Sequence, residues 1–112
     1  MDIVTGSHQI SVTTVVLDGR LDALEAAPLR QVLQEHIAAG EMHLAVDLAA
    51  VEFVDSAGLA ALVKGMKDAR SAGGDLRLVA PTAPDAFRVF ELTKFDKVFS
   101  MAPDLPTLLA QW

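Results

Sequence analysis

The chain has 112 residues, of which 52% are hydrophobic and 21% charged, a composition typical of one globular domain and not of a disordered chain. Fifteen acidic residues against nine basic ones give a net charge of -6, and no run of Lys or Arg is present, so direct nucleic-acid binding is not expected. The absence of cysteine excludes disulfides and thiolate metal sites. No apolar stretch approaches the roughly 20 residues of a membrane span, and MDIVTGSHQI lacks the features of a signal peptide, so we expect a cytoplasmic protein without membrane insertion.

The N-terminal segment predicts a β-hairpin. Ile3 and Val4 start one short strand, and the second covers 11–17, where β-branched residues are frequent. Asp18 and Gly19 are expected to end this second strand.

A helix and a buried strand follow the hairpin. Apolar residues at helical spacing predict a helix that starts near Ala26, because Pro28 fits only the first turn, and that ends at Gly40. The apolar run HLAVDLA, 43–49, predicts a buried strand.

A second helix is predicted to begin where an apolar run ends at Asp55 and Ser56 follows. Gly73 and Gly74 are expected to stop this helix. Its apolar stripe consists of Leu59, Leu62, Val63, Met66 and Ala69.

The last third of the chain predicts a strand at 76–80 and a third helix with Thr82 as its cap and Pro84 in its first turn. A short strand at 97–100 and a terminal helix opened by Asp104 follow. Alternating strands and helices predict an α/β fold, as one domain over residues 1–112. The hairpin makes the central sheet mixed, with about four or five strands and about four helices.

An enzyme active site is not expected. The strand–Ser56–helix junction resembles a nucleophile elbow, but Val54 stands where the first glycine should be. Neither His36, on an apolar stripe, nor His43, at a strand start, is placed as a base, and with His8 they show no metal-ligand spacing. We therefore expect no catalytic residue, no metal site and no cofactor.

Two interpretations of Ser56 remain open. The common one is a helix cap, since serine is frequent before an apolar helix. Gly58 argues against a plain cap, because glycine costs about 1 kcal/mol relative to alanine inside a helix. Its missing side chain would let another backbone or a bulky ligand approach Ser56 closely, and access for a partner is the role that we predict for it. The second interpretation is a modification site, because a helix N-terminus stabilises the charge of a phosphate.

The sequence resembles the STAS domain family, and specifically an anti-sigma factor antagonist of the SpoIIAA/RsbV type. The resemblance is carried by the stretch VDLAAVEFVDSAGLAALVKGMKDARSAGGDLRLVAPTAPDAFRVFELTKFDKVF. The upstream VVLDGRLDA matches the family's Gly-x-Leu-Asp segment, so the similarity covers nearly the whole chain. The resemblance implies that Ser56 is phosphorylated and that Asp22 is the loop aspartate at the partner surface. The resemblance also includes the family's Asp-Ser-x-Gly-Leu motif, here the DSAGL of residues 55–59, in which Ala57 stands at the motif's second hydroxyl position. The expected partner-binding residues are Asp22, Asp55, Ser56, Ala57, Gly58 and Leu59.

Partner switching without enzymatic activity is the function that this resemblance implies. The unphosphorylated protein binds an anti-sigma factor serine kinase and frees the sigma factor. Phosphorylation of Ser56, with ATP supplied by the kinase, ends binding, and a phosphoserine phosphatase resets the protein. The alternative within the family is a STAS subunit of a transport complex, such as one for phospholipid import, or of a stress-signalling scaffold, without a dedicated kinase.

Overall fold

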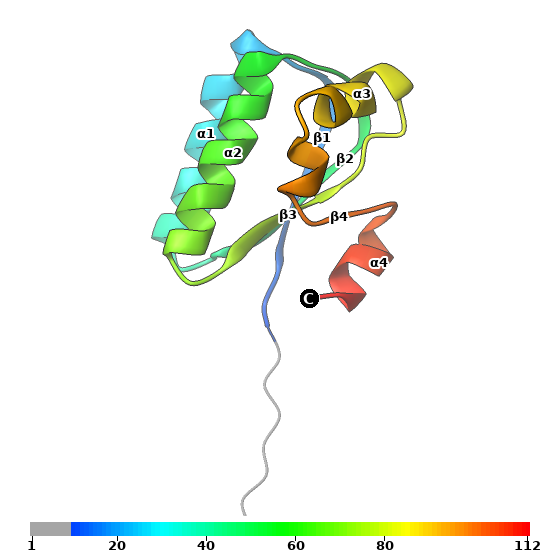
Figure 1. The fold of residues 1–112 in the computed structure, drawn as a ribbon. Helices are drawn as coiled ribbons and strands as arrows, with labels where there is room; N and C mark the ends of the chain where they lie inside the picture. The colour runs from blue at the N-terminus through cyan, green and yellow to red at the C-terminus, as the bar shows by residue number, and fades with distance from the viewer. Residues whose placement is uncertain (1–9) are drawn as a thin grey trace, which may run out of the picture.

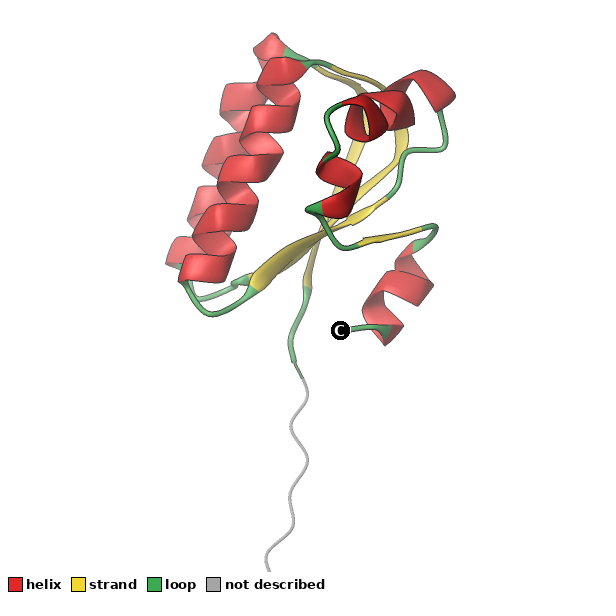
Figure 2. Cartoon of the chain, in the orientation of Figure 1, coloured by secondary structure: helices red, strands yellow, loops and turns green. Residues whose placement is uncertain are grey.

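The computed structural model describes residues 10–112 of the chain. Its four strands form a parallel sheet and lie in the order in which they occur along the chain (Figures 1 and 2). They are β1 (Thr13–Leu21), β2 (His43–Val54), β3 (Asp75–Val79) and β4 (Met101–Ala102). A helix lies in each connection, because parallel neighbours are joined by a crossover. The predicted α/β domain is confirmed.

The helices cover both faces of the sheet. They are α1 (Ala23–Ala38), α2 (Ser56–Ser71), α3 (Pro84–Leu92), the 3-10 helix η1 (Phe95–Lys97) and α4 (Leu105–Ala110). Side chains alternate along β2: Leu44 and Val46 belong to the larger core, together with residues of α1, α2 and α3, whereas Ala45 packs in a smaller cluster with Leu108 of α4. Because α1 and α2 lie side by side and each follows a parallel strand, they begin at the same end of the sheet (Figure 1).

The prediction that Asp18 and Gly19 end the first described strand is wrong. Strand β1 continues to Leu21, and its register with β2 shifts between Val16 and Asp18 and again between Gly19 and Arg20. Gly19 has a φ of 71°, which glycine adopts without steric cost, so the irregularity bends the strand without ending it. The partner strand expected at residues 3–4 lies outside the described residues, and the antiparallel pair stays a prediction.

The predicted start of the first helix is also wrong, since α1 begins at Ala23 and Pro28 lies inside it. The Asp22 side chain accepts a hydrogen bond from the Leu24 amide and thereby caps the helix. The helix therefore begins three residues before Ala26, its expected start. Pro28 is exposed, and the N–H that it lacks would have bonded only the Leu24 carbonyl, one turn from the helix start.

Two local predictions in the C-terminal third are wrong and two are confirmed. Residues 97–100 do not form a strand, because Phe95 and Phe99 pack against the larger core and the chain pairs with β3 only at Met101–Ala102. Ala83 is the N-cap of α3, since the Thr82 hydroxyl donates to the Ala49 carbonyl instead. Pro84 does begin α3, and Asp104 does cap α4.

No helix within residues 10–112 is long and apolar enough to cross a bilayer.

Candidate functional site

The candidate site lies where the C-terminal ends of β1 and β2 lead into α1 and α2. Leu21 and Val54 are register partners at the ends of the two strands, and the Asp55 amide donates to the Leu21 carbonyl at 3.2 Å. The N-termini of α1 and α2 therefore begin next to each other. Both contribute the partial positive charge of a helix start to the same corner of the molecule.

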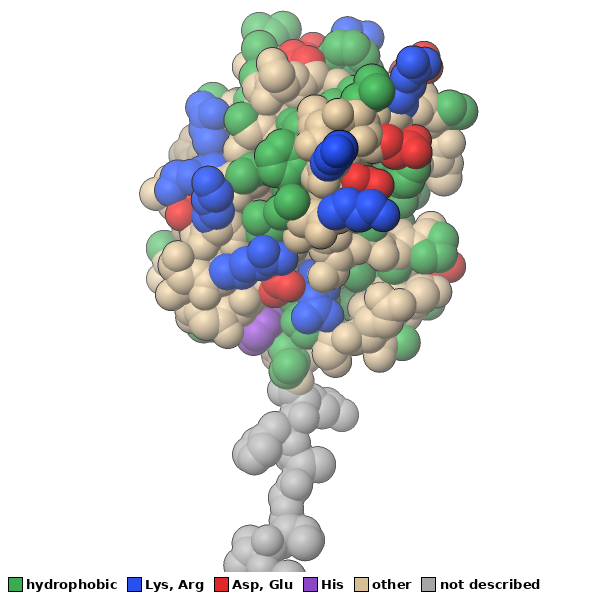
Figure 3. Space-filling model, viewed as in Figure 1, with side chains coloured by type: hydrophobic (Ala, Val, Ile, Leu, Met, Phe, Trp, Pro, Cys, Tyr) green, Lys and Arg blue, Asp and Glu red, His purple; other side chains and the backbone are tan. Residues whose placement is uncertain are grey.

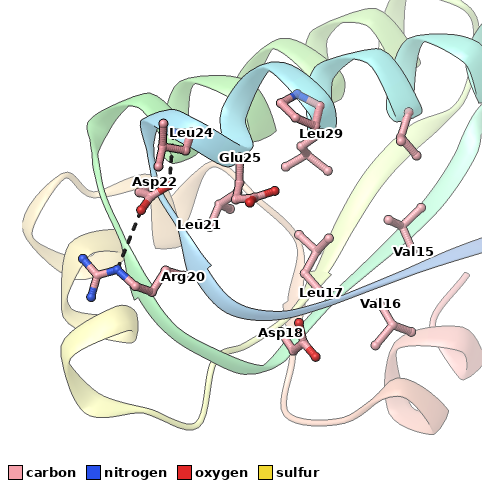
Figure 4. A pocket seen from close by; sticks show the side chains of 12 residues that line it. Val15, Val16, Leu17, Asp18, Arg20, Leu21, Asp22, Leu24, Glu25 and Leu29 are labelled. Atoms are coloured by element: carbon pink, nitrogen blue, oxygen red, sulfur yellow. Dashed lines mark hydrogen bonds and ion pairs between the residues drawn. The ribbon is translucent and has the colours of Figure 1, made fainter.

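Two aspartates cap the two helices. The Leu24 amide donates to Asp22 Oδ1 at 3.1 Å, and Arg20 Nε lies 3.7 Å from Asp22 Oδ2 (Figure 4). The Asp55 carboxylate accepts hydrogen bonds from two backbone amides. Its Oδ1 accepts from the Gly58 amide at 2.8 Å, and its Oδ2 accepts from the Ala23 amide at 3.1 Å. Asp55 thus holds the starts of both helices.

Ser56 is the first residue of α2 and not its cap, so the helix-cap interpretation of this serine is wrong. Asp55 has the extended backbone of an N-cap and accepts the capping hydrogen bond. Ser56 is exposed, and the side-chain hydrogen bonds of the described residues include none from its hydroxyl. An exposed, unengaged hydroxyl at a helix start is accessible to a modifying enzyme, and the helix dipole favours negative charge there.

The access role predicted for Gly58 is wrong, because this glycine is buried inside the protein. A Cβ at position 58 would lie 2.3 Å from the Leu21 carbonyl oxygen and 2.8 Å from Leu21 Cγ. The glycine lets α2 start directly against the end of β1. Of the two groups that the missing side chain could admit, the structure shows the backbone, that of Leu21, and the access of a partner through this position is not supported.

The six predicted partner-binding residues share one corner and differ in accessibility. Ser56 is exposed, Asp22, Asp55 and Ala57 are half-buried, and Gly58 and Leu59 are buried. Ser56 and the two capping carboxylates are therefore the polar groups that this corner presents.

A groove of about 670 Å³ extends from Ser56 between α2 and the segment formed by α3 and η1, and we call it the α2–η1 groove. Figure 3 shows hydrophobic side chains exposed on this face with Lys and Arg side chains around them. The apolar stripe of α2 predicts only one wall of this groove, because it does not reveal which segment packs beside it. The lining residues are Val54, Asp55, Ser56, Leu59, Ala60, Val63, Lys64, Lys67, Val89, Thr93 and Phe95.

A second groove, of about 690 Å³, lies between β1 and α1 (Figure 4). It includes Asp22 and the apolar side chains of Val16 and Leu24, which are 68% and 83% exposed. This groove does not follow from the sequence pattern, since Asp18 and Gly19 indicate the end of the strand there.

Neither described histidine lies at this corner. His36 pairs with Glu41 at the C-terminal end of α1, and His43 begins β2, at the opposite end of that strand from Ser56. His8 lies outside the described residues. Within residues 10–112, no group of three or more His, Asp or Glu side chains is arranged to hold a metal ion.

Comparison with known proteins gives the family of this fold. A family model described as "Mlab, STAS domain" matches residues 5–107, and the chain therefore belongs to the STAS domain family. A candidate anti-sigma factor antagonist from Thermotoga maritima superposes with a TM-score of 0.83 at 25% identity, covering 89% of this chain and 86% of that one. An anti-sigma factor antagonist from Mycobacterium paratuberculosis gives a TM-score of 0.80 at 30% identity, covering 95% and 88%.

The fold is also that of SpoIIAA in its unphosphorylated form, an anti-sigma factor antagonist, with a TM-score of 0.71 at 16% identity over 95% of this chain and 92% of that one. The resemblance drawn from the DSAGL motif is confirmed at the level of the family and the fold.

Proposed function

We propose that this chain is an anti-sigma factor antagonist, a binding protein without catalytic activity of its own. The observation that carries the proposal is the exposed Ser56 hydroxyl at the start of α2, which Asp55 leaves free by acting as the cap. The similar anti-sigma factor antagonists support it. In this role the unphosphorylated chain binds an anti-sigma factor serine kinase in the cytoplasm and releases the sigma factor.

Phosphorylation of Ser56 by the bound kinase switches the complex off in this proposal. The kinase supplies ATP, magnesium and the catalytic base, whereas this chain supplies only the hydroxyl. On the free surface, the added charge of about -1.5 to -2 is solvated and lies at the positive end of α2. In a packed interface the same charge must lose its water and lie near the Asp55 carboxylate, which weakens binding. A phosphoserine phosphatase then restores the binding form.

Intact-mass analysis of the chain purified from its own cells tests the modification. We expect a fraction heavier by one phosphoryl group, with fragmentation placing it on Ser56. Phosphate on another residue contradicts the proposed site. A chain that is never phosphorylated while it copurifies with a transport complex or a signalling scaffold favours the alternative function.

Calorimetric titration of the source organism's anti-sigma serine kinases tests the switch. Ser56→Ala should bind like the wild type and accept no phosphate from ATP. Ser56→Asp should stay folded and bind several-hundred-fold more weakly, a loss of about 3–4 kcal/mol. Ser71, the exposed last residue of α2, offers the matched control, and Ser71→Asp should bind normally. Equal affinities of Ser56→Ala and Ser56→Asp for the kinase would contradict the proposed phosphorylation switch.

A further inference from the structure

The α2–η1 groove has the shape and the chemistry of a docking site. Its walls consist mainly of apolar side chains, and Val63, Val89 and Phe95 are half-buried, so that they contact the core and still reach the surface. Asp55 and Ser56 line the same groove. A segment lying in it would therefore also be in contact with the corner where Ser56 lies.

The residues that line the groove include more basic than acidic side chains, although the whole chain is acidic. The protein has a net charge of -6, yet the groove is lined by Lys64 and Lys67 and by one acidic residue, Asp55, whose carboxylate already accepts two backbone hydrogen bonds. Lys64 pairs with Asp68 at 2.7 Å, whereas Lys67 has no ion pair among residues 10–112. Such a groove complements a ligand that carries apolar groups and negative charge.

The dimensions of the groove favour a polypeptide segment. From Ser56 to Lys67 the wall follows α2 for about 16 Å, or roughly three helical turns. An amphipathic segment presents apolar side chains at i, i+3, i+4 and i+7 over this length and places acidic side chains along its edges. On the α3–η1 side, the exposed Lys94 and Lys97 lie within two residues of Phe95, and so does the half-buried Asp96.

We propose that the α2–η1 groove binds an acidic amphipathic segment of the partner protein, with apolar anchors between α2 and η1 and carboxylates facing Lys64 and Lys67. This inference deepens the proposed function and rests on it in one respect, namely that the occupant is a protein. It adds the chemistry of the partner's docking segment and extends the contact surface from Ser56 along α2.

Photo-crosslinking in the source cells tests this proposal. The photoreactive residue p-benzoylphenylalanine replaces Ala60, an exposed alanine that lines the groove, and in the control it replaces Ala27, an exposed alanine of α1 outside both grooves. Mass spectrometry then identifies the crosslinked molecule. We expect position 60 to crosslink one protein segment with helically spaced apolar residues and acidic neighbours, and position 27 to give at most a tenth of that yield.

Charge reversal in the variant that carries the photoreactive residue at position 60 tests whether the lysines contribute to binding the acidic segment. Lys64→Glu with Lys67→Glu should lower the yield at position 60 at least tenfold. Arg30→Glu with Arg88→Glu makes the same change in net charge at exposed residues outside the groove and should change the yield less than twofold. Circular dichroism melting curves identify the variants that remain folded. Lys67→Glu alone is a milder variant, for which we expect a several-fold lower crosslinking yield at position 60.

The outcomes separate this inference from the proposed function. The groove proposal is overturned if position 60 crosslinks a lipid or a basic protein segment, or if it gives no product above the position 27 control. It is also overturned if the yield at position 60 is unchanged by the charge reversal. Partner switching at Ser56 stands in those cases if the phosphate and the Ser56 variants behave as expected. An acidic amphipathic segment from a protein that is not a sigma-binding kinase supports the groove and contradicts the proposed function.

Discussion

The carboxylate of Asp55 accepts a hydrogen bond from the amide of Ala23, which lies 32 residues earlier in the chain. Its other oxygen accepts from the Gly58 amide. One half-buried side chain therefore satisfies backbone donors at the starts of two helices, and these donors have no partner within their own helices. The position of Ser56 relative to α1 depends on this carboxylate.

Removal of Asp55 should be more destabilising than removal of the neighbouring cap. Asp55→Ala leaves two backbone amides without their acceptor and should lower the free energy of unfolding by about 2–3 kcal/mol. Asp22→Ala removes one capping bond and should cost about 0.5–2 kcal/mol. Urea unfolding followed by circular dichroism measures both values. A larger loss for Asp22→Ala would show that Asp55 does not link the two helices.

The charge of Asp22 can be separated from its capping role. Asp22→Ala cannot isolate a docking role, because the loss of the capping bond changes stability as well. Asp22→Asn keeps an oxygen acceptor and removes the charge, so the free energy of unfolding measured in urea should stay within about 0.5 kcal/mol of the wild type. If the carboxylate contacts the partner, affinity measured by calorimetry should fall at least several-fold. Unchanged affinity would show that the charge of Asp22 does not contribute to partner binding.

Gly58→Ala should destabilise the protein. The new Cβ would overlap the Leu21 carbonyl, and because this is backbone, α2 must shift, which we expect to cost about 1–3 kcal/mol. Gly65→Ala is the matched control on the same helix, since its Cβ would meet the ends of the Leu33 and Leu76 side chains, 2.7 and 3.0 Å away, which can rotate. The urea midpoint of Gly58→Ala should therefore fall further than that of Gly65→Ala, and the reverse order would refute the contact with Leu21.

Ser56 should contribute almost nothing to stability. Because Asp55 provides the cap, Ser56→Ala should change the free energy of unfolding by less than about 0.5 kcal/mol. Ser56→Asp should be neutral or gain about 0.3–1 kcal/mol from the helix dipole. Thermal and urea unfolding of the three proteins measure these differences. A loss of more than about 1 kcal/mol in Ser56→Ala would restore the capping role.

Asp104 should make the stability depend on pH at the acidic end. Hydrogen bonds from the side chain and the backbone amide of Thr107 lower the pKa of Asp104 in the folded protein. A lowered pKa means that the stabilisation is complete above the unfolded-state pKa and disappears as the pH falls through the folded-state pKa, a window below about pH 4. Asp104→Asn keeps an acceptor that does not titrate. The difference in Tm between wild type and Asp104→Asn should therefore shrink between about pH 6 and pH 2.5; a constant difference would contradict this assignment.

The sequence predicts best those features that local pattern determines. The second helix begins at Ser56 and ends just before Gly73 and Gly74 because an apolar stripe and a helix stop mark it. The choice between Asp55 and Ser56 as the cap is not local, because both residue types cap helices. The bond to Ala23 and the approach to Leu21 fix this choice in the folded chain.

Other features depend on contacts between distant segments. Strand β1 continues past Gly19 because β2 continues beside it, and the length of a paired strand does not follow from its own residues. The β-branched Val98 and the aromatic Phe99 favour a strand at 97–100, yet Phe99 packs with Phe90 and Phe95 beside a 3-10 turn. The α2–η1 groove likewise follows from the packing of α2 beside a segment some thirty residues later in the chain.

The contact between Gly58 and Leu21 has a consequence for the rate and entropy of association. With the start of α2 fixed against β1 and both helix caps satisfied, contacts within the chain itself hold the backbone around Ser56 in place. Binding then loses little loop entropy, and the encounter rate is set mainly by orientation and electrostatic attraction. A phosphate on Ser56 would consequently act by changing the local charge while the backbone of this corner keeps its shape.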